Sequence, residues 1–218
     1  MDIEKIEKTF NDLLKKLEKT EIDKNKLVEM ADELIKVVQY RRYEYRYGLY
    51  IGRFQPLHKG HCSVIRKALS ECEKLVLVIG STQEVGTRKN PFSFEDRKRF
   101  IEKVFEKDID RIIIIGLEDR PNIANDSSWG EYVFNKVNQI LDIKPEAVYA
   151  GEELINSHWY DTIDIVVKKV NRGDINVSAT EVREALYQND YNKVKAYLPS
   201  ELMEYYEFMK ERIQICYR

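Results

Sequence analysis

The sequence has no apolar run long enough to cross a membrane, and its charged first twenty residues lack the apolar core of a secretory signal peptide. We therefore expect a cytoplasmic protein that does not bind membranes. Cysteine is scarce too, because Cys62, Cys72 and Cys216 are the only three and their spacing is not that of a disulfide framework. The expectation is free thiols in a reducing compartment.

A strong net charge is missing as well. The 36 lysines and arginines nearly balance the 38 aspartates and glutamates, so the formal net charge of −2 gives no reason to expect nucleic-acid binding. Hydrophobic residues make up 43% of the chain and charged residues 34%, a balance typical of soluble globular proteins rather than disordered ones. A chain of 218 residues can hold one α/β domain and an appendage.

Histidine occurs only three times, yet two of the three, His58 and His61, stand in one short segment. Before them, residues 47–51 have the short apolar run of a buried strand, which ends at Gly52. After them, the spacing of an amphipathic helix is found at Val64, Ile65, Ala68 and Leu69. The segment therefore predicts a strand, a loop and a helix that begins near His61.

The loop between this strand and this helix is suited to binding phosphate. The first turn of a helix presents unpaired N–H groups and the positive end of the macrodipole, which favour an anion. His58 and His61 flank this turn, and Arg53 lies in the same loop. Capping or packing is the ordinary role of an isolated histidine, but two histidines and an arginine in one loop favour phosphate. A zinc site is less favoured, because Cys62 is the only nearby thiol and no second cluster completes four ligands.

A helical hairpin is predicted for residues 1–40, where two successive sets of apolar residues have helical spacing. Residues 39–46 have the composition of a linker, so we divide the chain into an appendage at 1–45 and a main domain at 46–218. A DNA-reading helix-turn-helix is disfavoured because the hairpin has no basic face. Packing on the core or on another subunit is favoured, which leaves a homo-oligomer open.

The rest of the chain alternates strands and helices. Apolar runs predict four further strands at residues 75–79, 112–115, 147–151 and 163–167. Ser93 and Asp96 have the spacing of a capping box that opens a helix to about Phe105, and two closing helices between 186 and 209 are broken at Pro199. This order implies parallel strands joined by right-handed crossovers. We therefore predict an α/β fold with a parallel five-stranded sheet flanked by helices.

Two later segments are candidates for the same edge of the sheet. A long polar loop at residues 116–128 ends where Trp129 begins a helix, and a long loop in a compact domain usually closes a site or packs locally. Core packing remains the alternative for this tryptophan. Ser178 and Glu181 have the spacing of a capping box, and Arg183 follows in the first turn of that helix. A triphosphate could there meet helix N–H groups and a guanidinium together.

Four segments together resemble a known family. They are Gly52–His61, Gly80–Glu84, Asn90–Phe92 and Ser178–Arg183. The first is similar to the G-R-F-Q-P-x-H-x-G-H signature of the nucleotidyltransferase superfamily, and the four in this order resemble the archaeal-type nicotinamide mononucleotide adenylyltransferases. The last matches the family's I-S-x-T-x-x-R motif with conservative departures at two positions, and the resemblance covers roughly residues 46–200.

The resemblance implies a Rossmann-like fold and transfer of AMP from ATP to nicotinamide mononucleotide, with Mg²⁺ carried by ATP rather than held by a metal site of the protein. It implies catalytic roles for Arg53, His58, His61 and Arg183. It implies ATP-binding roles for Gly52, Phe54, Gly60, Gly151, Ser178 and Thr180. Acceptor binding falls to Asn90 and to Trp129, which in this family stacks on the nicotinamide ring.

The chemistry of such a transfer agrees with these residue types. A phosphate nucleophile is already ionised near neutral pH, so the alignment of two anions and the neutralisation of charge suffice without a general base. The acceptor stays open, because nicotinate mononucleotide or FMN could take the same transfer. A nucleotide-sensing regulator, in which the hairpin reports to a partner, is an alternative from another class. The full set of arginines and histidines favours the enzyme.

Overall fold

The computed structural model describes residues 43–119, 128–151, 158–171 and 177–218, together with Lys15, Val28, Glu29 and Asp32. The chain divides into two compact units, Met1–Arg42 and Tyr43–Arg218, and the second contains everything that follows. Apart from the four isolated positions, the helical hairpin expected at residues 1–40 lies outside the described residues.

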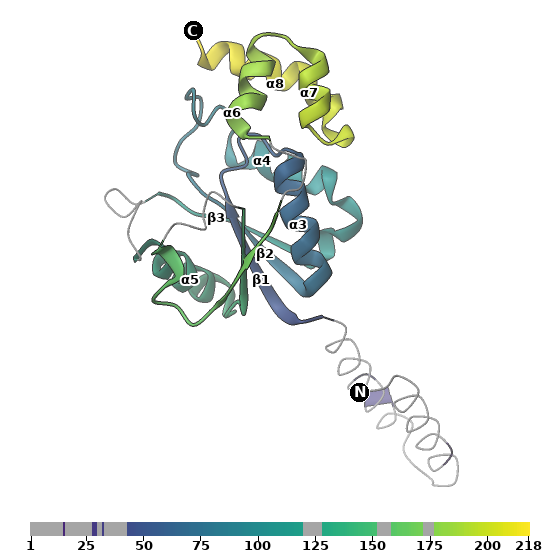
Figure 1. The fold of residues 1–218 in the computed structure, drawn as a ribbon, viewed down its shortest axis with the longest axis vertical. Coiled ribbons are helices and arrows are strands. Elements are labelled where there is room, and N and C mark those ends of the chain that lie inside the picture. The colour runs from purple at the N-terminus through teal and green to yellow at the C-terminus, as the bar shows by residue number, and fades with distance from the viewer. Residues whose placement is uncertain are drawn as a thin grey trace. The chain divides into compact units, whose positions relative to one another are not determined.

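The second unit is built on a sheet of five parallel strands in the order β3-β2-β1-β4-β5 (Figure 1). The strands are β1 (Tyr45–Gly52), β2 (Cys72–Ile79), β3 (Ile112–Gly116), β4 (Ala147–Ala150) and β5 (Val166–Lys169). The predicted five-stranded parallel sheet is thus confirmed. The strand order reverses at β1, whose two neighbours are β2 and β4, and parallel sheets bind ligands at the carboxyl ends of the strands beside such a reversal.

Several predicted strand boundaries were wrong, among them the start of β2, which begins at Cys72 rather than at residue 75. Tyr45 and Arg46 were assigned to the linker, but they belong to β1, where Tyr45 pairs with Cys72 of β2. The fifth strand begins at Val166 rather than Ile163, because the three preceding residues follow a turn in which Ile163 donates its N–H to Tyr160. An apolar run marks burial, but only the partner strand decides where the ladder begins.

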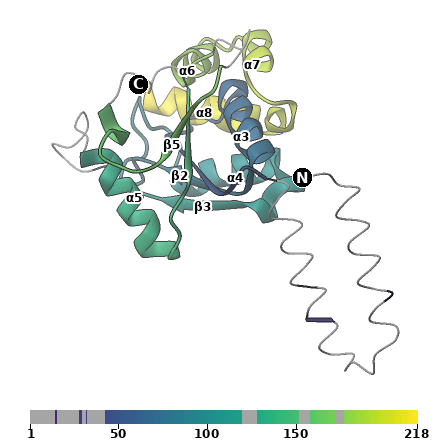
Figure 2. The same ribbon diagram turned by 60° about the horizontal axis from the view of Figure 1, so that its bottom comes forward.

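Helices cover both faces of the sheet (Figures 1 and 2). They are α3 (Lys59–Glu71), α4 (Phe94–Val104), α5 (Ser128–Leu141), α6 (Ala179–Tyr187), α7 (Tyr191–Tyr197) and α8 (Tyr206–Cys216), with 3-10 turns η1 (Glu106–Arg111), η3 (His158–Tyr160) and η4 (Ser200–Tyr205). Successive strand residues belong to opposite cores. Tyr50 lies in the core that includes residues of α3, α4 and α6–α8, whereas Leu49 and Ile51 lie in the core that includes residues of α5. The cavity described below is lined by residues of both cores, among them Tyr50 and Ile51.

The helix ends agree largely with the sequence. Both predicted capping boxes are present, Ser93 with Asp96 on α4 and Ser178 with Glu181 on α6. The chain breaks at Pro199 as predicted, but the closing helices are shifted, because residue 186 belongs to α6 and α8 continues to Cys216. Within the described ranges, no helix is long and apolar enough to cross a membrane.

The three cysteines are free thiols. Cys62 on α3 and Cys72 at the start of β2 are fully buried, and burial raises the pKa of Cys62 to about 12 and that of Cys72 to about 11. Cys216 at the end of α8 is partly exposed, and the smaller burial there also raises its pKa. None of the three lines the cavity described below.

Candidate active site

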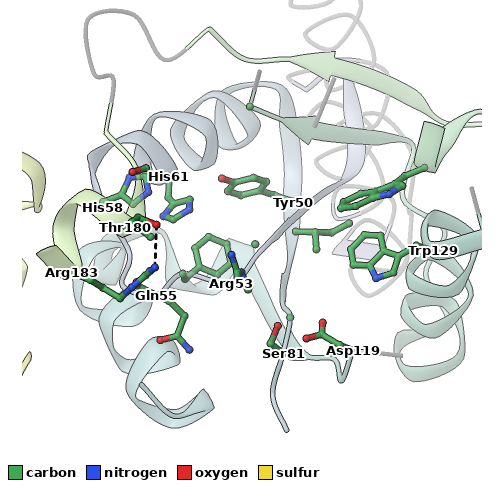
Figure 3. A pocket seen from close by; sticks show the side chains of 18 residues that line it. Tyr50, Arg53, Gln55, His58, His61, Ser81, Asp119, Trp129, Thr180 and Arg183 are labelled. Carbon is green, nitrogen blue, oxygen red and sulfur yellow. Dashed lines mark hydrogen bonds between the residues drawn. The ribbon is translucent and has the colours of Figure 1, made fainter. Parts of the chain in front are cut away.

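A cavity of about 470 Å³ lies at the carboxyl ends of β1, β2 and β4, where Gly52, Gly80 and Gly151 contribute to its wall. The structure brings ten of the twelve expected site residues to this cavity: Gly52, Arg53, Phe54, His58, His61, Trp129, Gly151, Ser178, Thr180 and Arg183. Gly60 and Asn90 are not part of the lining. Figure 3 shows His58, His61, Thr180 and Arg183 gathered at one end and Trp129 at the other.

The two histidines form a stacked pair at the start of α3. His58 is the N-cap residue with extended backbone angles (φ −139°, ψ 171°), and its side chain makes no capping hydrogen bond. The ring centroids of His58 and His61 lie 3.7 Å apart with 29° between the ring planes, and the Phe54 ring meets His61 edge-on at 4.9 Å. The helix was predicted to begin near His61. It begins at Lys59, so His61 lies inside its first turn.

His58 is 2% exposed, whereas His61 is half-buried, so the cavity reaches the pair mainly through His61. Two imidazoles beside a helix N-terminus can both donate hydrogen bonds to an anion there. The absence of a capping bond from His58 argues against the ordinary capping role that one such histidine would have.

Arg183 joins α6 to the loop after β1. Its Nη1 donates to the carbonyl of Gln55 at 2.8 Å. Its Nη2 donates to Oγ1 of Thr180 at 3.1 Å, a bond drawn in the close-up (Figure 3). Its Nε is buried without a hydrogen-bond partner among the described residues, and the side chain is 7% exposed. Arg53, in contrast, is an exposed guanidinium at the edge of the same cavity. The cavity is therefore lined by one buried guanidinium that is hydrogen-bonded to the protein and by one exposed guanidinium on a long flexible stem.

The N-terminus of α6 forms another part of the cavity wall at this end. The Ser178 hydroxyl accepts a hydrogen bond from the Glu181 N–H at 3.3 Å, and the Glu181 carboxylate accepts from the Ser178 N–H at 2.7 Å. Hydrogen bonds from the Ser178 hydroxyl and N–H lower the pKa of Glu181. The cavity is lined by Ser178, Ala179 and Thr180. The capped start of α6 therefore both stabilises this helix and forms part of the site.

Two tryptophans form the apolar end. The ring centroids of Trp129 on α5 and Trp159 on η3 lie 4.2 Å apart with 38° between the planes, and both half-buried rings line the cavity. Gly130 makes this approach possible, because a Cβ there would overlap the carbonyl oxygen of Trp159. Trp129 also packs against the core beneath α5, so the same side chain both packs in the core and lines the cavity.

Trp159 had no role in the sequence prediction. One signal was available, since it is the second of only two tryptophans and follows the strand that ends at Gly151. The prediction also gave no role to Tyr50, Ser81 and Asp119, which line the cavity too. Asp119 is paired with Gln83, whose Oε1 accepts the Asp119 N–H at 3.0 Å.

Gln55 lies in the first of the four motifs, and its side chain holds this motif against the third motif, which contains Phe92. Its side-chain amide donates to the carbonyl of Phe92 at 2.9 Å and its Oε1 accepts the Phe92 N–H at 3.0 Å. These two hydrogen bonds hold the loop after β1 against the segment that precedes α4. Gln55 is 1% exposed, so the bonds are buried and costly to break.

Asn90 and Gly60 lie elsewhere. Asn90 is 2% exposed, its side-chain amide donates to the Glu84 carboxylate, and its main-chain N–H donates to Oγ1 of Thr87 at 3.0 Å. It thus closes the loop between β2 and α4, and its acceptor-binding role stays a prediction. Gly60 is buried in the first turn of α3, below the cavity wall.

The arrangement can hold a polyanion at one end and a flat ring at the other. Two helix N-termini, two imidazoles and two guanidinium groups serve the first purpose, and the tryptophan pair serves the second. Across the described ranges, no group of three or more histidine, cysteine, aspartate or glutamate side chains could hold a metal ion. A parallel sheet with such a cavity beside its strand-order reversal defines a nucleotide-binding protein of the Rossmann-like class.

The chain belongs to the cytidylyltransferase-like family, whose family model matches residues 49–198. It is 31% identical over 174 residues to the nicotinamide-nucleotide adenylyltransferase of Thermococcus sibiricus, covering 77% of this chain and 88% of that protein. It is also 31% identical over 149 residues to the nicotinamide/nicotinic acid mononucleotide adenylyltransferase of Acinetobacter baylyi, covering 67% and 78% of the two chains.

Among solved structures, the fold matches a bifunctional NMN adenylyltransferase/ADP-ribose pyrophosphatase from Francisella tularensis, complexed with AMP and a manganese ion. The TM-score is 0.64 at 27% sequence identity, and the match covers 79% of this chain. Our chain spans about half of that bifunctional protein, since 52% of its length is matched.

Proposed function

We propose that the protein is an adenylyltransferase that moves AMP from ATP to nicotinamide mononucleotide and releases NAD and pyrophosphate. The observation that carries the proposal is the division of one cavity into a cationic end, with His61 and Arg183, and an indole-lined end, with Trp129 and Trp159. A triphosphate suits the first end and a nicotinamide ring the second. The names of the Thermococcus and Acinetobacter relatives support the same reaction.

In this reaction a phosphate oxygen of nicotinamide mononucleotide attacks the α-phosphorus of ATP. A new P–O bond forms, the bond from the α-phosphorus to the bridging oxygen breaks, and pyrophosphate leaves with the electron pair. The nucleophile is already an anion near neutral pH, so the protein has to align two anions and neutralise the charge that builds up between them. No proton needs to move in this step.

The residues at the cationic end divide this work. His58 and His61, together with the N-terminus of α3, donate hydrogen bonds to phosphate oxygens near the reacting phosphorus. Arg183 and the N-terminus of α6, at Ser178 and Thr180, hold the outer phosphates, and Arg53 closes over them from the exposed side. At the other end, the electron-rich indole of Trp129 favours a cationic nicotinamide ring.

We propose that Mg²⁺ enters bound to ATP. Among the residues that the structure describes, the lining contains one carboxylate, Asp119. The other polar groups of this described lining are cationic, imidazole, amide and hydroxyl groups, which is not the oxygen-rich cage that holds Mg²⁺ on a protein. When bound to the triphosphate, Mg²⁺ supplies further neutralisation of its charge. The solved Francisella tularensis protein is complexed with AMP and a manganese ion.

The decisive experiment gives the purified protein Mg²⁺-ATP with one mononucleotide at a time and identifies products by mass. Nicotinamide mononucleotide should give NAD, and pyrophosphate should appear in equal amount. The Acinetobacter relative is named for both pyridine nucleotides, so nicotinate mononucleotide is the second candidate acceptor and FMN the third. Product from nicotinate mononucleotide or FMN alone would reassign the acceptor. ATP binding without any product would favour the nucleotide-sensing regulator.

A further inference from the structure

Arg97 is a fully buried guanidinium behind the cavity wall. It lies in the first turn of α4, is 0% exposed and is not among the residues that line the cavity. Its partners are four main-chain carbonyls, as Nη1 donates to Arg53 at 2.9 Å and Gly80 at 2.7 Å, Nη2 to Ser81 at 3.3 Å and Nε to Ser93 at 3.1 Å. Burial lowers the pKa of Arg97 to about 10, so the group is still a cation at neutral pH.

Three of these carbonyls, those of Arg53, Gly80 and Ser81, come from the two turns that follow β1 and β2, and the fourth belongs to the N-cap of α4. Each turn contains a residue other than glycine in the left-handed region, Phe54 with φ 50° and Ser81 with φ 54°. Side chains with a Cβ adopt this region reluctantly, and such residues persist only where the surrounding structure holds them. Arg97 bonds the peptide groups on both sides of Ser81 and the one that precedes Phe54.

The direction of these peptide groups matters for the cavity. In a trans peptide, the carbonyl and the following N–H point in opposite directions. The carbonyls of Arg53 and Gly80 point at Arg97, so the N–H groups of Phe54 and Ser81 point away from it. Both residues line the cavity, and neither N–H donates a hydrogen bond to any other residue that the structure describes.

We propose that Arg97 is a positioning residue that holds both left-handed turns so that the N–H groups of Phe54 and Ser81 face the phosphates of the bound nucleotide. The inference rests on the proposed function for the identity of the ligand. Arg97 itself does not touch the nucleotide. Its charge lies directly behind the two peptide groups, where it also increases the positive potential at the phosphate site.

The chain contains a matched control in Arg111. This guanidinium also bonds main-chain carbonyls, with Nε donating to Glu73 at 3.0 Å and Nη2 donating to Leu69 at 2.6 Å and Cys72 at 2.7 Å. These carbonyls belong to the end of α3 and the start of β2, at the end of the sheet opposite the cavity. Arg111→Lys therefore removes the same kind of bond without touching the turns at Phe54 and Ser81.

The test compares Arg97→Lys and Arg111→Lys with the unchanged protein. Lysine keeps the charge but cannot reach several carbonyls at once. We expect both variants to melt at lower temperature, and only Arg97→Lys to weaken ATP binding, by about tenfold in calorimetric titration, while adenosine binding changes less than twofold. Equal effects of the two variants on ATP, or equal loss of ATP and adenosine by Arg97→Lys, would overturn the proposal.

A measurement on the unchanged protein keeps the proposal testable if Arg97→Lys does not fold. Amide hydrogen exchange with and without Mg²⁺-ATP should show the N–H groups of Phe54 and Ser81 becoming protected, whereas adenosine should not protect them. Exchange of both amides at the same rate with and without ATP would refute the role. Because these readouts concern binding, a protein that binds ATP but makes no NAD would refute the proposed function and leave the role of Arg97 standing.

Discussion

Nη1 of Arg183 donates a hydrogen bond over 2.8 Å to the carbonyl of Gln55, a residue 128 positions earlier in the chain. Gln55 is in turn fastened through its side chain to Phe92. One chain of hydrogen bonds thus connects the start of α6, the loop after β1 and the segment before α4. The walls of the cavity are therefore held to one another before any nucleotide binds.

Arg183→Lys should raise the Michaelis constant for ATP by about tenfold and lower the melting temperature. An ammonium group cannot bond Gln55, Thr180 and a phosphate together as the guanidinium fork can. Steady-state kinetics with varied ATP measure the effect. Arg66→Lys is the control, because that guanidinium lies over the Phe105 ring at 5.7 Å on the exposed face of α3. A change in stability alone would make Arg183 a structural residue.

His61→Ala should lower turnover by roughly two to four orders of magnitude, the scale of losing one preorganised donor in the transition state. Its melting temperature should change little because the ring is half-buried. His58→Ala should act in the same direction on turnover but lower stability more, since His58 is 2% exposed. Turnover and thermal melts of both variants check this, and turnover near that of the unchanged protein in His61→Ala would refute the assignment.

Ser178→Ala and Asp190→Ala each remove an N-cap, the first on α6 and the second on α7. Both should lose roughly 1 kcal/mol of stability in denaturant titrations. Only Ser178 lines the cavity, so only Ser178→Ala should also raise the Michaelis constant for ATP. If the two variants match in kinetics as well as in stability, the start of α6 is a cap and not a phosphate site.

Trp129→Ala should weaken nicotinamide mononucleotide by roughly 2- to 30-fold while the Michaelis constant for ATP stays nearly constant. The reason is that a cationic ring gains more from an indole face than a neutral ring does. Trp129→Phe should recover part of the loss, and Trp159→Ala should weaken the same substrate, because the two rings are adjacent. Kinetic titrations of each substrate decide it, and equal losses for both substrates would place acceptor recognition elsewhere.

Deletion of residues 1–42 should leave adenylyl transfer detectable, because the cavity lining that the structure describes lies between Tyr50 and Arg183. Deletion of residues 1–46 is the informative contrast. It also removes Tyr45, which pairs with Cys72 and whose ring lies 5.0 Å from the Lys168 ammonium. The longer deletion should melt at lower temperature. A folded 43–218 fragment without activity would show that the deleted residues contribute to the site.

The sequence predicts the strands and the phosphate loop because their signals are local. Four isoleucines in a row at residues 112–115 indicate a buried strand, and the spacing of Ser178 and Glu181 indicates a cap within one helical turn. The loop that carries His58 and His61 was recognised by its motif. These features need no knowledge of what lies across the fold.

The remainder depends on contacts between distant segments. Nothing local to Arg97 indicates that its guanidinium meets carbonyls from the ends of two strands, because it stands in an ordinary charged helix. Trp159 was overlooked because its place in the site depends on the close approach that Gly130 allows. Asn90 lies in a segment that resembles the family, but its side-chain amide donates a hydrogen bond to Glu84 in the same loop rather than lining the cavity.

Because Cys62 and Cys72 are buried, the rate at which they react with a thiol reagent reports local unfolding of the protein. A thiol-specific reagent can reach Cys216 in the folded state, whereas it can reach the two core thiols only while the region between α3 and β2 is transiently open. Labelling followed by mass spectrometry therefore times this opening without denaturant or turnover. The factor by which ATP slows the labelling of Cys62 and Cys72 would then measure how strongly the bound nucleotide stabilises the domain against this opening.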